Sequence, residues 1–268
     1  MKQIIITLTT LTVIIFGCSK DNVISTGANQ VANQDNFIAS KPPDPRSDTL
    51  PSAVSEKAIL IDASRDGGVW WFPQSSQTGF LQANSHQGEN LENYLKSLGF
   101  EVNTLPRGTV ITNDILDKYS NVIRAGGYGS YSENELLAYQ SFLNRPTSLL
   151  LLTDHLTYFP NDLLSAQLGL QFVGPCQGPI TSFASHSITT GVSFLPYIAG
   201  SVINSPYPSN VVMLGSLQIP VAGGEIISVG TMGILNHPTS RIFFMGDMNG
   251  IETVPQPLTS NLANWLFR

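Results

Sequence analysis

The chain has 268 residues, of which 42% are hydrophobic and 12% charged, so its composition is that of a folded globular protein. Its formal net charge is −6 at pH 7, and its 13 Lys and Arg residues are spread along the chain without a basic block. These values argue against nucleic acid or anionic lipid headgroups as partners, because both need a concentrated positive surface.

The first 17 residues have the pattern of an export signal. Lys2 supplies a positive charge, and a nearly continuous apolar run follows over residues 4–16. As a helix this run is about 20 Å long, which is too short for a hydrocarbon core about 30 Å thick. It ends in Ile15-Phe16-Gly17-Cys18, which resembles the lipobox of bacterial lipoproteins, although Phe16 is bulkier than the residue usual there.

That resemblance implies cleavage before Cys18, acylation of its sulfur with fatty acids such as palmitate, and a lipid anchor in the cell envelope, most simply in an outer membrane. An ordinary secretory signal and an uncleaved anchor are the alternatives. Residues 18–56 are rich in Asn, Ser, Asp, Gln and Pro. They cannot bury enough apolar surface to offset the entropy of ordering, so we expect a disordered tether.

One cysteine, Cys176, remains in the domain expected over residues 57–268. A disulfide from Cys18 to Cys176 would tie the anchor to the core, so we expect none. Cys176 lies in the segment 174–178, whose glycines and proline predict a loop.

From residue 57 onward, short apolar runs alternate with amphipathic segments. Strands are predicted at 58–62, 100–105, 121–125, 148–153, 211–214, 226–230 and 241–246. Helices are predicted at 90–98, 113–119, 132–143, 161–168 and 257–267, and Ser132-Glu133-Asn134-Glu135 forms a capping box at the third of them. This alternation predicts an α/β domain with a doubly wound, mostly parallel sheet and helices on both faces, as in flavodoxin-like folds.

Several segments together carry a family resemblance: 60–62, 98–102, 122–127 followed by 132–135, 186–192 and 243–247. Their order resembles the class I glutamine amidotransferase-like superfamily, and within it the non-catalytic trehalose-utilisation-type and gliding-protein-type branches. Catalytic members of that family carry a cysteine on the turn after the strand that here ends at 152. This chain has Thr153-Asp154-His155 there and also lacks the family's His-x-Glu, so the resemblance implies no glutamine hydrolysis.

In such sheets, ligands bind beyond the carboxyl ends of the strands. That rule selects the loops 62–89, 126–131, 154–160 and 247–257. The first of them concentrates charge and aromatic rings, and we take Asp62, Arg65, Asp66, Trp70 and Trp71 as candidate ligand-binding residues. The alternative is structural: Asp62 and Arg65 pair with each other while the tryptophans hold the loop on the core.

The turn 126–130 supplies Gly127 and Tyr128 as further candidate contacts, because glycines let backbone approach a ligand ahead of a helix N-terminus. It matches no nucleotide-binding or nucleophile-elbow motif, and a tight turn is its default interpretation. Asp154, His155 and His86 are candidates for acid–base catalysis. No spacing matches a metal signature, and no cofactor is expected; His186 and His237 are interpreted as turn residues.

The sequence therefore favours a membrane-anchored envelope lipoprotein with a non-catalytic amidotransferase-like domain. We expect this domain to bind a small polar ligand, a glycan or an envelope protein. The alternative is an envelope hydrolase or isomerase that uses Asp154, His155 and His86.

Overall fold

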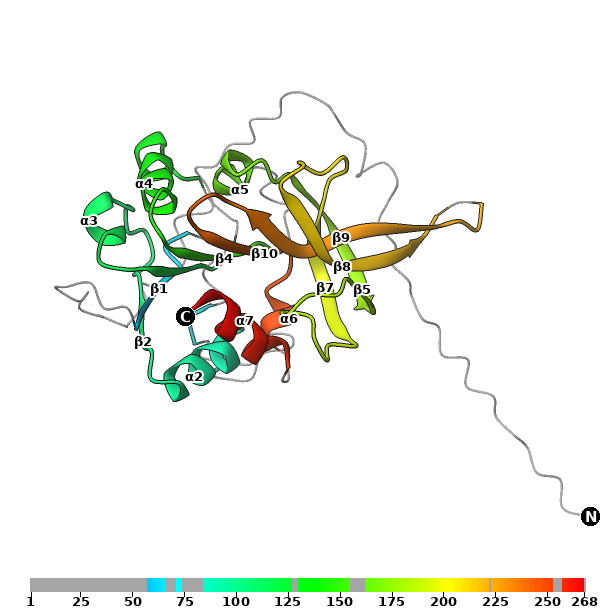
Figure 1. Cartoon of the computed structure of the whole chain (residues 1–268), viewed down its shortest axis with the longest axis horizontal. Helices are drawn as coiled ribbons and strands as arrows, with labels where there is room; N and C mark the ends of the chain where they lie inside the picture. The colour runs from blue at the N-terminus through cyan, green and yellow to red at the C-terminus, as the bar shows by residue number, and fades with distance from the viewer. Residues whose placement is uncertain are drawn as a thin grey trace, which may run out of the picture.

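A computed structural model describes residues 57–65, 71–73, 84–126, 130–154, 162–221, 223–252 and 257–267 (Figure 1). Residues 1–56, for which an export signal and a tether are predicted, lie outside the described residues. So do six predicted site residues: Cys18, Asp66, Trp70, Gly127, Tyr128 and His155. Among the helices of the described part, none combines the length and the apolar character needed to cross a membrane.

Parallel strands form one half of a single ten-stranded sheet, in the order β2-β1-β3-β4-β10. Their bounds are β1 (Ala58–Asp62), β2 (Glu101–Thr104), β3 (Asn121–Arg124), β4 (Ser148–Leu152) and β10 (Arg241–Met245). The helices are α2 (Glu89–Ser97), α3 (Asn113–Leu116), α4 (Glu133–Leu143), α5 (Leu163–Gln167), α6 (Asn249–Glu252) and α7 (Leu258–Leu266). Each predicted strand and helix of this half is present.

Side chains alternate along these strands between two apolar clusters, as the pleat requires. Ile59 and Ile61 of β1 belong to a cluster with residues of α2, α6 and α7. Leu60 of the same strand belongs to another cluster, with residues of α3, α4 and α5. The four leucines of β4 divide between the same two clusters, which explains their unbroken apolar run.

Antiparallel strands form the other half, which continues from β10 as β9-β7-β5, with β8 beside β9 and β6 beside β8. Their bounds are β5 (Phe172–Ile180), β6 (Ser182–Phe183), β7 (Leu195–Ile203), β8 (Val211–Pro220) and β9 (Ile226–Asn236). The sheet is therefore mixed, and the expected doubly wound, mostly parallel sheet is corrected in this respect. The predicted strands 211–214 and 226–230 are short parts of β8 and β9.

Segment 174–178 belongs to β5, so the predicted loop is wrong. β5 is the terminal strand of the sheet order and shows register shifts on either side of Cys176. Proline lacks the backbone donor of a central strand but is tolerated at an edge, which explains Pro175 and Pro179 in β5. Cys176 is buried there and disulfide-bonded, contrary to our expectation.

Candidate functional site

Asp62, at the carboxyl end of β1, is a buried carboxylate that accepts four hydrogen bonds. The donors are Ser64 N at 3.1 Å and Ser64 Oγ at 2.5 Å, with the hydroxyls of Tyr131 at 2.7 Å and Tyr139 at 2.5 Å. Burial, and next the neighbouring charge of Asp62, raise the pKa of both phenols well above their usual value, so both remain neutral donors. Asp62 is thus the centre of an internal network.

Arg65 lies on the outer side of this network and also binds within the protein. Its Nε donates to the carbonyl of Ser130 at 3.0 Å, and its Nη1 donates to Ser64 Oγ and to the carbonyl of Thr109. Its Nη2 pairs with the carboxylate of Glu135 on α4. The guanidinium also lies over the ring of Tyr131, 4.6 Å from its centroid.

Asp62 and Arg65 are therefore linked indirectly, through Ser64 and Tyr131. The structural alternative for this loop predicted that Asp62 and Arg65 pair directly. The observed link between them is indirect. These contacts occupy the hydrogen-bonding groups that a ligand would use, and ligand binding by either residue stays an untested prediction.

Trp71 is fully buried and fastens the same loop to α2. Its Nε1 donates to Glu92 Oε2 at 3.2 Å, and Glu92 also pairs with Lys96. The ring of His86 lies 5.9 Å from the Trp71 ring, and His86 Nε2 is 3.5 Å from the same Glu92 oxygen. The face of this tryptophan packs inside the domain and is not presented to solvent.

Asp154 lies at the turn after β4, the position at which catalytic members of the resembled family carry a cysteine. It is 5% exposed, and its carbonyl accepts a hydrogen bond from Ser201 Oγ of β7. Asp247, at the corresponding end of β10, is fully buried, and its carboxylate accepts from Ile198 N at 2.6 Å and Asn249 N at 2.8 Å. Cys176, inside β5, is not at this turn.

β7 covers these two strand ends at very close range. Ser201 N donates to the carbonyl of Gly246 at 2.6 Å, and the Tyr197 hydroxyl donates to the carbonyl of Ser201. A Cβ atom on Gly200 would lie 2.5 Å from the Cβ of Asp247, and one on Gly246 would overlap the Ser201 carbonyl. Only glycine permits this approach.

Tyr197 lies beside both acidic residues. Burial first, and then the charges of Asp247 and Asp154, raise its pKa well above the usual value. Its hydroxyl is therefore a neutral hydrogen-bond donor at neutral pH, and the strand ends are closed by a network of protein groups.

The acid–base candidates do not form one described cluster. His86 contacts Trp71 and Glu92, whereas Asp154 contacts Ser201 and lies near Tyr197. Among the described residues there is no group of three or more His, Cys, Asp and Glu side chains that could hold a metal ion.

A buried ion pair that the sequence does not predict lies next to the Asp62 network. Arg124, at the end of β3, is fully buried and binds Asp162 in a bidentate manner, at 2.8 and 2.6 Å. Burial opposes its charge, but Asp162 more than compensates and raises the pKa of Arg124 further. An arginine inside an apolar strand signals a buried acidic partner, but the sequence does not identify that partner.

A hollow of about 220 Å³ is lined by residues 191–195 together with Pro257 and Leu258. None of the predicted site residues lines it.

Comparison with known proteins supports the fold. No family model matches the chain, and no curated protein matches its sequence. The mmIFT52 N-terminal domain matches with a TM-score of 0.56 at 13% identity, covering 77% of this chain and 94% of that one. A ThuA-like protein from Bacteroides uniformis matches with a TM-score of 0.51 at 15% identity, covering 82% and 93%.

A cytoplasmic protein from Salmonella typhimurium matches with a TM-score of 0.50 at 13% identity, covering 78% of this chain and 96% of that one. At such identities the likeness concerns the fold alone. The ThuA-like neighbour is consistent with an amidotransferase-like fold.

Proposed function

We propose that the chain is a lipid-anchored lipoprotein of the cell envelope whose amidotransferase-like domain carries out no chemistry and binds a protein partner. The observation that carries this proposal is the closure of the β4 and β10 strand ends by β7. The lipobox-like Ile15-Phe16-Gly17-Cys18 supports the anchor.

Closure of the strand ends argues against catalysis at the family's position. A general acid or base must come within about 3 Å of the atom whose proton it transfers. Asp154 and Asp247 are buried, and β7 occupies the space that a substrate would need. Acid–base chemistry by Asp154 in the hydrolase or isomerase alternative would require β7 to move away.

A protein partner is favoured over a small polar ligand because Asp62 and Arg65, the charged ligand candidates among the described residues, are already hydrogen-bonded inside the domain. Large apolar side chains, in contrast, are exposed on the antiparallel half. They include Phe194, Ile198 and Ile226. Exposed apolar groups of this size suit contact with another protein surface.

Metabolic labelling tests the anchor. Cells that express the full chain with its signal are grown with an alkyne analogue of palmitate, beside cells that express Cys18→Ser. We expect label and membrane sedimentation for the wild type, and loss of both for Cys18→Ser. Equal labelling of the two chains would show that Cys18 is not the acylated residue.

An activity screen tests the absence of chemistry. The purified mature chain is incubated with glutamine, chromogenic glycosides and peptides, beside the variants Asp154→Asn and His155→Ala. We expect no turnover above that of the variants. Turnover that disappears in His155→Ala would instead establish the hydrolase or isomerase alternative.

A further inference from the structure

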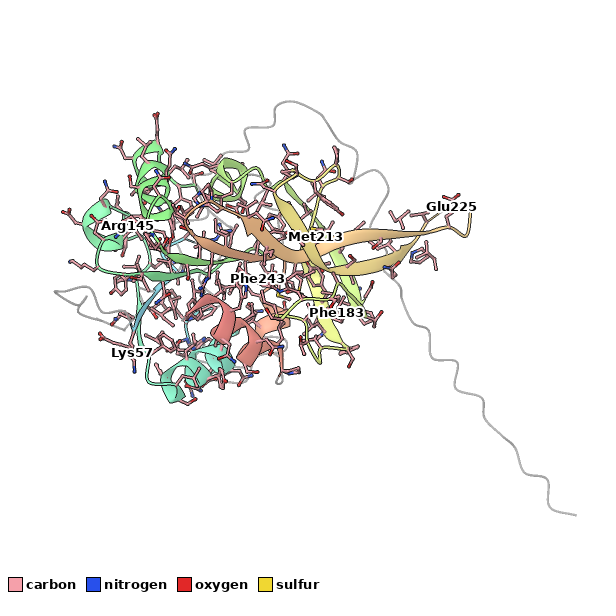
Figure 2. All side chains as sticks on the ribbon, in the orientation of Figure 1. Lys57, Arg145, Phe183, Met213, Glu225 and Phe243 are labelled. Atoms are coloured by element: carbon pink, nitrogen blue, oxygen red, sulfur yellow. The ribbon has the colours of Figure 1, made fainter. Side chains whose placement is uncertain are left out.

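The β8–β9 ribbon extends away from the body of the domain (Figure 1). Figure 2 shows Met213 near the body and Glu225 at the far end. The two strands pair over almost their whole length, to Pro220 opposite Ile226. On its other side, β9 pairs with β10 from Met232 onward and with β7 only at Gly230.

Residues 226–229 of β9 therefore have no neighbouring strand on that side among the described residues. The chain after β7 turns away: Asn204 N donates to the carbonyl of Gln171, and the Tyr207 hydroxyl accepts from Gly230 N. Tyr207 thus ends the existing ladder at Gly230, and an open stretch of β9 edge begins beyond it.

This edge lacks the features that normally block edge pairing. Proteins protect exposed edges with lysines, prolines or bulges. On β8, Pro220 lies opposite Ile226 and removes a backbone donor, whereas 226–229 contains neither proline nor charge. Ile226 is 67% exposed and Ile227 37% exposed, so the edge is apolar as well as open.

We propose that residues 226–229 of β9 pair antiparallel with the same residues of a second copy of this chain. The occupant must be a strand, because only extended backbone satisfies a row of N–H and C=O groups. With a two-fold axis perpendicular to the sheet, an even-numbered residue lies opposite an even-numbered one and an odd-numbered residue opposite an odd-numbered one. Centring the axis on Ile227 pairs Ile227 with Ile227 of the second copy and Ile226 with Ser228 of the second copy.

Charge placement is compatible with this self-pairing. Glu225 is the only charged residue within 211–236. In the proposed register, the two copies of Glu225 are four residues apart along the strands, or about 13 Å. This exceeds the screening length of about 8 Å at physiological ionic strength, so repulsion between them is weak.

Cross-linking tests the register. In the full chain carrying Cys18→Ser, which has no acyl chain, Ile227→Cys is oxidised with copper phenanthroline. Gln218→Cys, an exposed position on β8 of the same ribbon, is the matched control. We expect covalent dimer for Ile227→Cys and at least about tenfold less for Gln218→Cys. Equal yields from the two positions would overturn the proposal.

Sedimentation velocity tests the interface without a cross-link. Ile227→Lys places like charges opposite each other on the axis. Val212→Lys changes a side chain of similar exposure, 39%, outside the open edge. We expect at least about a tenfold increase in the dimer dissociation constant for Ile227→Lys and less than about twofold for Val212→Lys, with unchanged circular dichroism. A parent chain that stays monomeric at every concentration rules the pairing out.

Discussion

Asp62 shows how this domain stabilises a buried carboxylate without a directly paired cation. Two tyrosine hydroxyls and Ser64 donate to it, while Arg65 is held nearby by Ser64, Tyr131 and Glu135. The hydrogen bonds go to a charged acceptor, so each contributes more than a neutral bond. The loop after β1 is fixed by this network.

Removing one donor tests that contribution. Tyr139→Phe leaves Asp62 without one hydroxyl, and we expect the free energy of unfolding to fall by about 1.5–3 kcal/mol. Urea unfolding measures the change. Tyr94→Phe, at a partly exposed position of α2, is the control and is expected to stay within about 0.5 kcal/mol. Equal effects of the two variants would mean that the hydroxyl is not important to Asp62.

Glu135 makes the free energy of unfolding of the domain depend on pH in the acid range. Burial alone would raise the pKa of Glu135, but the N–H groups of Ile111 and Ser132 and the Arg65 guanidinium outweigh it and lower that pKa. Because the pKa is lower in the folded than in the unfolded chain, this carboxylate contributes stability above its unfolded pKa of about 4.3. The contribution is lost as the pH falls through the folded value.

Unfolding experiments across pH check this sign. We expect the wild type to lose more stability than Glu135→Gln between neutral pH and the acid range below about pH 4.3. Glu133→Gln changes an exposed carboxylate on the same helix and serves as the control. If the free energy of unfolding changed with pH in the same way for the wild type and Glu135→Gln, Glu135 would not be the source of the pH dependence.

At the scale of elements, β7 closes the carboxyl ends of β4 and β10. Its approach depends on Gly200, where a Cβ would lie 2.5–2.8 Å from Asp247, Tyr197 and the Gly246 carbonyl. We expect Gly200→Ala to destabilise the domain by about 1–3 kcal/mol through overpacking, while Ser193→Ala, in the exposed segment before β7, changes little. Thermal unfolding followed by circular dichroism measures both. A stable Gly200→Ala chain would show that β7 lies further from the strand ends.

The elements with regular local signals could be predicted from the sequence. The capping box of α4 is present: Ser132 Oγ accepts from Glu135 N, and the Glu135 carboxylate accepts from Ser132 N. The bonds from Glu135 to Arg65 and Ile111 could not be predicted, because they join segments far apart in the chain. β5 and β7 could not be predicted as strands from the sequence, because their prolines and glycines are typical of loops.

The candidate site, too, could be predicted only in its local features. Asp62, Asp154 and Asp247 lie at or just beyond strand ends of the parallel half, as the sequence predicted, and a ligand role for them stays a prediction. They could not predict that β7 returns over two of these ends, because this depends on close backbone contact at Gly200 and Gly246. The alternation of strands and helices gives no information about a strand that crosses from the other half of the sheet.

At the scale of the whole molecule, the fate of Cys18 can be tested directly. Cys18 is the only other cysteine of the sequence, and acylation through its sulfur excludes a disulfide to Cys176. The proposed anchor therefore predicts one titratable thiol in the denatured chain extracted from membranes. The unacylated chain, oxidised after purification, is expected to have none, and Ellman titration with mass spectrometry of the N-terminal peptide measures both. A membrane-extracted chain without any thiol would contradict the anchor.

The position of β10 has a consequence for biogenesis. This strand is the last in the sequence, yet it lies between β4 and β9 and joins the two halves of the sheet. During synthesis the two halves cannot be united until residues 241–245 have left the ribosome, and contacts between such distant segments form slowly. The nascent chain thus cannot complete this sheet until β10 has been synthesised.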